Sequence, residues 1–574
     1  MRDVNKNNNI VASWIVKFLK SKKVDTIFGL QGGHIQPIWD FCYKLGIKII
    51  DVRDEKAAVH MAQAYSFFTG KIGVVLVTAG PGVTNTVTGV ANAFLSSTPI
   101  LVIGGCPPTK QKNKGPLQDI PHIEILKSIT RYARTASVSS EVIREINFAY
   151  SCSIGQIAPP GPSYIEIPTN ILRKNLKQDL ILEEFFKEEK KYIIHPNPKD
   201  IELAIETIQK SKKPILITGR GAKGCSHEIE RLITNTDILY LDTQESRGVV
   251  SYKNSNNVYA ARGKAFSEAD LVILVGRKLD YQLAFGSKAV FKNATFIRIS
   301  DSTEELIDNR RGFPEIYADP ALTLKQLLKK ITNTKFNKKW IKSIKKTNLE
   351  KINKYKKISN MKTLKDGKIN PAFIFDVVYE TLGEDFIGIA DGGDFLSFAR
   401  VGLKSKYYLD SGAFGCLGTG IPYAISAAKI FKNKKVICFT GDGAFGFNAM
   451  ELDTAVRNKC NVCIIISNNA GWSIETHDQK LNYGNRVYGT TLRESNYAKL
   501  AEGLGCKSYR IEKPDELKNK LKEALDNTPS VIDVTTSSLA LSSDAKKGLG
   551  LVPDYQALED WDELEKIYRK KNKH

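Results

Sequence analysis

The sequence predicts an α/β protein built from three doubly wound parallel-sheet domains. Three observations support this class. Short apolar runs rich in β-branched residues alternate with longer amphipathic stretches, which is the pattern of strands and helices in α/β sheets. Runs of this kind are expected of parallel strands that helices cover on both faces. The chain has 574 residues, of which 42% are hydrophobic, enough for about three domains and their cores.

The runs fall into three blocks, which we expect to be three domains joined by a charged linker. The first domain, residues 1–182, has expected strands at Thr26–Gly29, Ile47–Val52, Gly73–Thr78, Ile100–Gly104 and Tyr164–Ile167. The central domain, residues 190–335, has expected strands at Pro214–Thr218, Leu239–Asp242, Leu271–Val275 and Thr295–Ile299. Residues 336–368 form the predicted linker, which is charged and helical. The third domain, residues 369–574, has expected strands at Phe386–Ala390, Lys435–Thr440, Val462–Ser467 and Ser530–Val534.

The composition argues against several classes of protein. The formal net charge of +22 is spread over scattered lysines, without the aromatic-interleaved basic stripe that nucleic-acid binding needs. No apolar run approaches the about 20 residues of a membrane span, so neither nucleic acid nor membrane is an expected partner. The nine cysteines are dispersed, and Cys460 and Cys463 lack a second pair at zinc spacing. We interpret them as core thiols of a protein in the reducing cytoplasm.

A glycine turn follows an apolar strand in the third domain. The strand runs directly into Gly441-Asp442-Gly443, and a helix is expected at Asn448–Asn458. Glycines allow the backbone to approach an anion closely, and the amino end of a helix favours phosphate. Asp442 stands at the carboxyl end of its strand, where ligands bind in open α/β sheets.

A second strand ends in oxygen-bearing residues 27 positions after Asp442, at Asn469. Mg²⁺ binds an octahedron of hard oxygens and takes few of them from the protein when phosphate is present. The carboxylate of Asp442, the amide oxygen of Asn469 and the backbone carbonyl of Gly471 would supply three. Two oxygens of a bound diphosphate and one water would complete the set.

This element resembles the diphosphate-binding motif of thiamine-diphosphate enzymes. From about Ile10 to about Tyr568 the chain is similar to the branch that contains acetolactate synthase, 2-hydroxyacyl-CoA lyase and benzaldehyde lyase. The resemblance implies thiamine diphosphate and Mg²⁺ as cofactors, with pyrimidine-binding, central and diphosphate-binding domains in that order. Further cofactor-binding positions implied by the resemblance are Gly393 and Asp394 over the diphosphate, Gly415 and Leu417 in the wedge under the cofactor, and Ala444 and Trp472 beside the metal residues.

Glu55 is the predicted catalytic acid, because thiamine chemistry needs a carboxyl that promotes the imino form of the aminopyrimidine. It follows a strand and opens an Ala-rich helix; in isolation it would be a solvated acid at a helix start. Its surroundings resemble the family's strand, acidic pair and Ala-Ala element, although Asp54 stands where many relatives have histidine. Gly80, Pro81 and Asn85 resemble the family's turn beside the aminopyrimidine.

Two further residues are predicted to reach the substrate. Gln118 resembles the family's glutamine, a neutral amide that can hydrogen-bond a developing hydroxyl. His34 resembles the histidine of the benzaldehyde lyase loop, and Gly33 before it leaves space; the alternatives are a surface loop glutamine and a turn histidine without a role. The resemblance also implies a homodimer or homotetramer in which Glu55 of one subunit faces the cofactor of another.

Several functions remain open at this point. The leading hypothesis is an acetolactate-synthase-like carboligase that decarboxylates a 2-keto acid such as pyruvate and transfers the acyl unit to a second carbonyl, such as an aldehyde. The alternative is a lyase that cleaves a 2-hydroxy ketone or a 2-hydroxyacyl-CoA, which the His34 loop and Trp472 favour. A third is a cofactor-binding homologue without catalysis. Because relatives bind FAD or ADP near the turn Gly219-Arg220-Gly221-Ala222, FAD is a possible but disfavoured additional cofactor.

Overall fold

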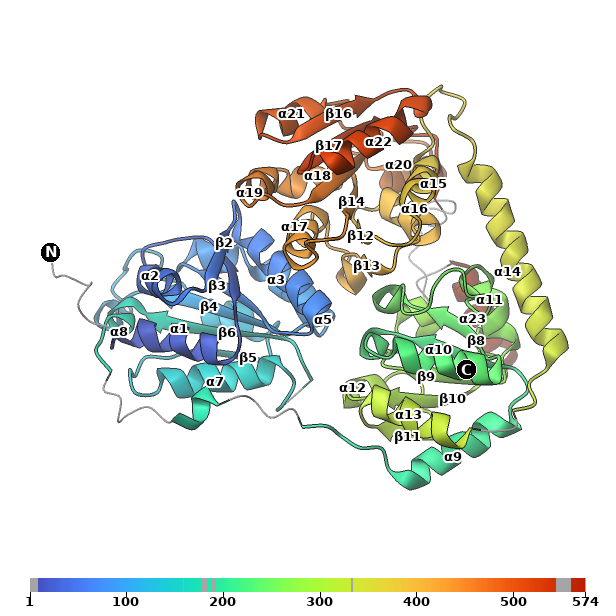
Figure 1. The fold of residues 1–574 in the computed structure, drawn as a ribbon, viewed down its shortest axis with the longest axis horizontal. Coiled ribbons are helices and arrows are strands. Elements are labelled where there is room, and N and C mark those ends of the chain that lie inside the picture. The colour runs from blue at the N-terminus through green and yellow to red at the C-terminus, as the bar shows by residue number, and fades with distance from the viewer. Residues whose placement is uncertain are drawn as a thin grey trace.

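Three parallel β-sheets covered by helices make up the molecule (Figure 1). The structure is a computed structural model that describes residues 9–157, 159–176, 183–187, 192–331, 334–542 and 559–572. The sheets have six, five and six strands, and every strand pair among the described residues is parallel. The predicted class, three doubly wound α/β domains, is therefore confirmed.

The N-terminal domain has a six-stranded sheet in the order β2-β1-β3-β4-β6-β5. Its strands are β1 (Thr26–Gly29), β2 (Lys48–Asp51), β3 (Gly73–Val77), β4 (Ile100–Cys106), β5 (Tyr132–Thr135) and β6 (Pro162–Pro168). Its helices are α1 (Val11–Ser21), α2 (Gln36–Leu45), α3 (Glu55–Thr69), α4 (Pro81–Thr84), α5 (Val87–Leu95), α6 (His122–Lys127), α7 (Val142–Ser153) and α8 (Thr169–Leu172). Because β2 and β3 flank β1, the strand order reverses between β1 and β3, and such a switch point is where open α/β sheets bind ligands.

The central domain has a five-stranded sheet in the order β11-β10-β9-β7-β8, with its switch point between β7 and β9. Its strands are β7 (Pro214–Thr218), β8 (Leu239–Asp242), β9 (Leu271–Val275), β10 (Thr295–Ser300) and β11 (Glu315–Tyr317). Its helices are α9 (Pro198–Lys210), α10 (Ser226–Thr236), α11 (Arg262–Glu268), α12 (Thr303–Leu306) and α13 (Pro320–Lys330). The charged segment after it forms α14 (Lys338–Ser359), which buries Trp340 and Ile344 against the central core.

The C-terminal domain has a six-stranded sheet in the order β13-β12-β14-β15-β17-β16, with its switch point between β12 and β14. Its strands are β12 (Ile387–Ala390), β13 (Tyr407–Leu409), β14 (Val436–Gly441), β15 (Val462–Asn468), β16 (Lys507–Ile511) and β17 (Ser530–Thr535). Its helices are α15 (Pro371–Leu382), α16 (Asp394–Gly402), α17 (Gly420–Ile430), α18 (Asp442–Asn448), α19 (Glu451–Arg457), α20 (Ser473–Asn482), α21 (Tyr497–Gly503) and α22 (Leu517–Asp526). Asp442, Asp394 and Trp472 therefore all lie at or next to the starts of helices that follow strands.

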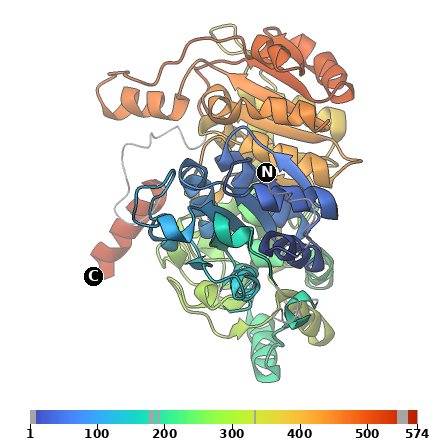
Figure 2. The same ribbon diagram turned by 90° about the vertical axis from the view of Figure 1, so that its left-hand side faces the viewer.

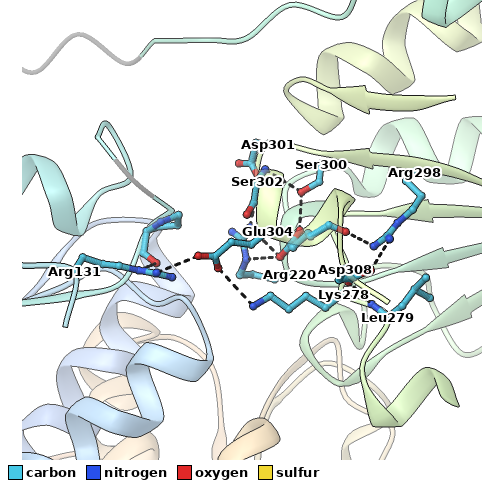
Figure 3. Close-up of polar contacts among 12 residues, drawn as sticks. Arg131, Arg220, Lys278, Leu279, Arg298, Ser300, Asp301, Ser302, Glu304 and Asp308 are labelled. Atoms are coloured by element: carbon cyan, nitrogen blue, oxygen red, sulfur yellow. Dashed lines mark hydrogen bonds and ion pairs between the residues drawn. The ribbon is translucent and has the colours of Figure 1, made fainter. Parts of the chain in front are cut away.

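The domains are joined by polar contacts as well as by apolar packing. Helix α3 packs against α17, so one apolar core is shared by the N- and C-terminal domains. At this interface Asn92 donates to the Tyr423 hydroxyl, which donates to Gln63, each at 2.8 Å. Arg131 of the N-terminal domain reaches Glu304 of the central domain at 3.3 Å (Figure 3).

The last described helix, α23 (Glu559–Asn572), lies beside the central domain, where Figure 2 shows it in dark red. Trp561 on this helix packs its ring 6.3 Å from that of Phe266. In the part of the chain that the structure describes, no helix is long and apolar enough to cross a bilayer.

The strands that the sequence did not predict are all edge strands. These are β5, β11, β13 and β16, each of which has one neighbour in its sheet. The side chains of β5, β11 and β16 are partly exposed, unlike those of the fully buried β3, β4 and β9. These three strands lack the continuous apolar run on which the prediction depended, and β13 has only three residues, two of them buried. One helix also differs: the helix expected at Asn448–Asn458 begins earlier, as α18 at Asp442, and is followed by α19.

Candidate functional site

At the C-terminal switch point two glycine-containing segments lie side by side. Gly392 follows β12 and Gly441 ends β14, and these two strands are neighbours in the sheet. A side-chain carbon built on Gly392 would lie 3.3 Å from the backbone nitrogen of Gly441 and 3.6 Å from the Cβ of Ala444. Gly392 also has a φ of 103°, which L side chains rarely adopt. The backbone conformation of Gly392 therefore favours glycine, and its contact with Gly441 is tight.

Asp442 and Asn469 each carry a buried oxygen without a hydrogen-bond partner among the described residues. Asp442 is 2% exposed and its Oδ2 is unpaired, as is the Oδ1 of Asn469. Burial raises the pKa of Asp442 to about 6, although backbone N–H groups, including that of Gly471, act in the opposite direction. A buried carboxylate and amide oxygen left without donors are costly unless a cation occupies the space between them. The residues present therefore fit a hard cation such as Mg²⁺.

The loop that carries Gly471 is tethered to the segment at Thr490. Ala470 has a φ of 58°, and the Trp472 N–H donates to the Thr490 carbonyl at 2.8 Å. A side-chain carbon on Gly443 would lie 2.5 Å from the Trp472 ring, so this ring packs directly on the Gly441–Gly443 turn. The structure thus brings the predicted cofactor residues Gly441, Gly443 and Trp472 together.

The predicted capping and wedge segments lie near the same switch point. A side-chain carbon on Gly393, which precedes Asp394, would touch Ile474 of α20 at 3.4 Å. The residues that directly follow the wedge segment Gly415–Leu417 are held by Asp391, a residue that we did not predict. Its carboxylate accepts the backbone N–H of Gly418 at 3.1 Å and that of Gly420 at 2.8 Å. Burial raises the pKa of Asp391 to about 6, against the effect of these N–H groups.

Glu55 is the first residue of α3 and is 5% exposed. Asp54 caps the helix by accepting the N–H of Lys56 at 2.8 Å. The Asn85 amide donates to Glu55 Oε2 at 2.9 Å, and a side-chain carbon on Gly82 would lie 3.4 Å from Oε1. One carboxyl oxygen is therefore occupied by a neutral donor, while the other faces a glycine that leaves it space.

The N-terminal switch point holds the predicted substrate residues. A side-chain carbon on Gly80 would lie 2.7 Å from the Cβ of Gln118, so this turn and Gln118 pack tightly; Pro81 follows as the first residue of α4. His34 Nδ1 lies 3.3 Å from the Thr78 hydroxyl. Burial lowers the pKa of His34, and the nearby charge of Arg173 lowers it further. Its imidazole is consequently neutral near pH 7.

A contact between domains supports the segment that presents Glu55. Glu451, at the start of α19, accepts the backbone N–H groups of Arg53 at 2.9 Å and Asp54 at 3.2 Å. Arg457 of the same helix donates to the backbone carbonyl of Asp51, the last residue of β2, at 3.2 Å. Sequence reasoning missed Glu451, because neither its spacing nor its neighbours indicate a partner about 400 residues away.

The glycine turn of the central domain is closed by the chain itself. A side-chain carbon on Gly219 would lie 2.5 Å from Arg277 Cδ, and one on Gly221 would lie 2.8 Å from Gly276 Cα. Arg220 forms ion pairs with Glu305 at 3.2 Å and with Asp301 at 3.3 Å (Figure 3). Packing and ion pairing therefore account for this turn, and the interpretation of FAD as a possible but disfavoured cofactor stays a prediction.

A cavity of about 670 Å³ lies where the three domains meet. Its lining includes Lys71 of the N-terminal domain, Arg220 and Lys223 of the central domain and Tyr408 of the C-terminal domain. None of the predicted catalytic, cofactor or metal residues lines it. The candidate site therefore consists of the two terminal-domain clusters and not of this cavity.

Comparison with protein families matches all three domains. Residues 10–125 match the thiamine pyrophosphate enzyme N-terminal TPP binding domain, residues 201–327 its central domain, and residues 393–534 its C-terminal TPP binding domain. The chain is 30% identical over 555 residues to 2-hydroxyacyl-CoA lyase 2 of Danio rerio, covering 89% of this chain and 88% of the relative. It is 30% identical over 548 residues to 2-hydroxyacyl-CoA lyase 1 of Mus musculus, covering 90% and 92%. It is 29% identical over 537 residues to a probable acetolactate synthase of Mycobacterium bovis, covering 91% and 95%.

Proposed function

The chain belongs to the thiamine pyrophosphate enzyme family, and from this premise we propose that it cleaves the carbon–carbon bond next to the carbonyl of a 2-hydroxyacyl-CoA or a 2-hydroxy ketone. Cleavage of a 2-hydroxyacyl-CoA yields an aldehyde and formyl-CoA. The observation that carries the proposal is the 30% identity to two 2-hydroxyacyl-CoA lyases over 89% and 90% of this chain. The neutral polar side chains of His34, Thr78 and Gln118 at the N-terminal switch point also suit the hydroxyl and carbonyl of such a substrate.

The cofactors of this proposal are thiamine diphosphate and Mg²⁺. When bound, thiamine diphosphate supplies the carbanion and electron sink that cleavage next to a carbonyl requires. Asp442, Asn469 and the Gly471 carbonyl would hold the metal ion, since the first two carry the buried unpaired oxygens. The glycine-containing turns around Gly441 and Gly393 would admit the diphosphate.

In this proposal Glu55 is the acid–base residue. Its Oε2 accepts the Asn85 amide, so Oε1 is the oxygen that would hold and exchange a proton. Burial of the carboxyl keeps water away from that proton. His34 and Gln118 would orient the substrate hydroxyl and carbonyl, and His34 would accept or return the hydroxyl proton at a ring nitrogen.

We further propose that at least two subunits assemble, with Glu55 of one subunit facing the cofactor residues of another. Within one chain, Asn85 hydrogen-bonds Glu55 in the N-terminal domain, and Asp442 lies at the switch point of the C-terminal domain. A complete site would then need both domains from different subunits, as a homodimer or homotetramer.

A decarboxylating carboligase is the second candidate, and the similarity to a probable acetolactate synthase over 91% of this chain favours it. This reaction would release CO₂ from a 2-keto acid such as pyruvate and transfer the acyl unit to a second carbonyl. Both candidates use the same metal and acid–base residues and differ in what the substrate pocket accepts.

The test supplies purified protein with thiamine diphosphate, Mg²⁺ and one donor at a time: a 2-hydroxyacyl-CoA, benzoin, or pyruvate with and without benzaldehyde. Aldehyde release from either of the first two, without CO₂ from pyruvate, is the expected result. CO₂ release that rises with benzaldehyde would replace the lyase by the carboligase. A protein that binds the cofactor by calorimetry and turns over none of the donors would be a non-catalytic homologue.

A further inference from the structure

A buried histidine lies directly beneath the Gly80 turn. His122 is 2% exposed, and its Nε2 accepts the backbone N–H of Gly80 at 2.8 Å. Its Nδ1 lies 2.7 Å from Glu166 Oε2. A backbone N–H can only donate, so Nε2 carries no proton, and Nδ1–H must donate to Glu166. The two contacts together define one tautomer and one ring orientation for His122.

Glu166 is itself held by two hydroxyl donors. The Thr135 hydroxyl donates to Oε1 at 2.6 Å, and the Tyr164 hydroxyl donates to Oε2 at 2.9 Å. Glu166 lies on β6 and Thr135 on the edge strand β5. A carboxylate with three donors on a buried strand is a rigid support for the imidazole.

The Gly80 turn is the point at which the proposed reaction residues meet. Its Cα packs against Gln118, and its φ of 63° is one that L side chains rarely adopt. Two residues before it Thr78 contacts His34, and two residues after it Gly82 faces Glu55. A displacement of this turn would move the surroundings of all three proposed reaction residues.

We propose that His122, oriented by Glu166, is a positioning residue that holds the Gly80 turn in the geometry that the reaction needs. This inference rests on the proposed function of the site. His122 acts through Gly80 and does not touch the substrate. Within the His122–Glu166 pair, the Nε2 atom of His122 performs this role, because it accepts the Gly80 N–H.

Two substitutions separate this role from general support of the core. In His122→Gln the side-chain oxygen can take the place of Nε2 and still accept the Gly80 N–H. In His122→Asn the shorter amide can take the place of Nδ1 and reach Glu166, but it leaves the Gly80 N–H unpaired. Each variant loses one hydrogen bond, so a purely structural role would affect both equally. His227→Gln, on a side chain that is 75% exposed, is the matched control.

Hydrogen exchange of the peptide that contains Gly80, followed by mass spectrometry, measures this contact without any turnover. We expect exchange at Gly80 to be about five- to tenfold faster in His122→Asn, with His122→Gln and His227→Gln close to the unsubstituted protein. In the turnover assay we expect kcat of His122→Asn to fall about 10- to 100-fold with KM nearly unchanged, because small displacements from reacting geometry carry large costs.

The outcomes separate the two hypotheses. Equal exchange and equal kcat in the Asn and Gln variants would overturn the positioning role. If the unsubstituted protein binds thiamine diphosphate but turns over no donor, the proposed function fails. In that case exchange at Gly80 alone decides whether His122 holds the turn. Exchange that is faster in His122→Asn but not in His122→Gln supports the positioning role, and equal exchange in the two variants overturns it. Glu166→Gln, which keeps an acceptor for Nδ1–H, is expected to lose less than His122→Asn in both measurements.

Discussion

The central and the C-terminal domain both place a glycine turn at the switch point of their sheet, yet the two turns differ in what fills the space beside them. In the central domain Gly219 and Gly221 pack against Gly276 and Arg277. In the C-terminal domain a side-chain carbon on Gly441 would meet nothing within 4 Å, and Asp442 next to it carries an unpaired buried oxygen. A glycine turn therefore indicates close approach, but the surrounding chain decides whether a ligand or another loop makes that approach.

The charges at the two turns point to the same difference. Arg220 of the central turn is paired with Glu305 and Asp301, so its charge is balanced within the chain. Asp442 in the C-terminal turn and Asn469 after the neighbouring strand β15 each have an oxygen that no described residue satisfies. The first arrangement balances its charge within the chain, and the second leaves oxygens that the proposed Mg²⁺ would satisfy.

The largest expected effect concerns the terminal domains. Changing Glu55 to Gln removes the proton that Oε1 would carry and keeps the Asn85 contact. We expect turnover to fall at least about 100-fold, the usual weight of a general acid–base group, while calorimetric binding of thiamine diphosphate with Mg²⁺ remains. Glu475→Gln, at the start of α20, is the control for loss of an acidic group at a helix start. A Glu55→Gln enzyme that kept more than about a tenth of the activity would refute the assignment.

The next effect tests the C-terminal turn against the central one. We expect Asp442→Asn to weaken Mg²⁺-dependent binding of thiamine diphosphate at least about 10- to 100-fold, because it removes a charged ligand. Glu305→Gln in the central domain should leave this binding unchanged. Calorimetric titration of both variants with thiamine diphosphate and Mg²⁺ measures the two affinities. A comparable loss of affinity in Glu305→Gln would contradict the expected difference between the two turns.

The same two variants should have opposite effects on stability without cofactor. The pKa of Asp442 is raised to about 6 by burial, so between its ordinary value of 3.8 and about 6 the folded protein binds more protons than the unfolded chain. Stability falls as pH rises through this window, and Asp442→Asn should recover up to about 2–3 kcal/mol at pH 8.

At Glu305 the sign is reversed. Burial acts to raise the pKa of Glu305, but Arg220 and the Ser300 hydroxyl together leave it lowered. The ion pair therefore stabilises the fold above the ordinary pKa of a glutamate, and that stability is lost as pH falls through the lowered value. Glu305→Gln should cost about 1–3 kcal/mol at pH 8, less than a fully buried pair because Asp301 still faces Arg220. Denaturant unfolding of both variants at pH 8 and at pH 4 measures how each substitution changes the free energy of unfolding. Stabilisation by Glu305→Gln at pH 8 would contradict the expected opposite effects.

The smallest effect concerns the glycines themselves. Gly219→Ala introduces a carbon 2.5 Å from Arg277 Cδ and 2.7 Å from the Gly276 carbonyl oxygen, so we expect a loss of about 1–3 kcal/mol. Gly441→Ala enters open space and should change stability by less than about 0.5–1 kcal/mol, the ordinary range for a tolerated glycine replacement. Thermal unfolding of the two variants distinguishes them. Equal losses would show that the C-terminal turn is as tightly closed as the central one.

Most of the fold could be predicted from the sequence because its central strands are continuous apolar runs. The runs at Thr26–Gly29 and Leu271–Val275 are strands with the predicted bounds. The edge strands Tyr132–Thr135 and Lys507–Ile511 could not be predicted in this way, since they are largely half-exposed and carry polar residues, whereas the buried edge strand Leu239–Asp242 was predicted. The start of α18 was placed too late because Gly441–Gly443 indicates a turn, although the chain is already helical from Asp442.

The candidate site could be predicted where its residues are neighbours in the sequence or follow adjacent strands. Asp442 and Asn469 come directly after β14 and β15, which pair in parallel, so their proximity follows from the strand pattern. The residues that support the site were missed because their partners are distant along the chain. Asp391 holds the glycines after Leu417, and Glu451 holds the segment before Glu55 across a domain boundary.

The sequence by itself determined the three α/β domains and the positions of the oxygen-bearing and glycine turns, because strand periodicity and turn chemistry are local properties. Only the tertiary structure decided which turns remain open. The space beside the glycines of the central turn is filled by Gly276 and Arg277, which directly follow β9. The Gly80 turn is supported by His122 and Glu166. Whether a buried polar atom is satisfied depends on every segment that packs around it, and that information exists only once the chain has folded.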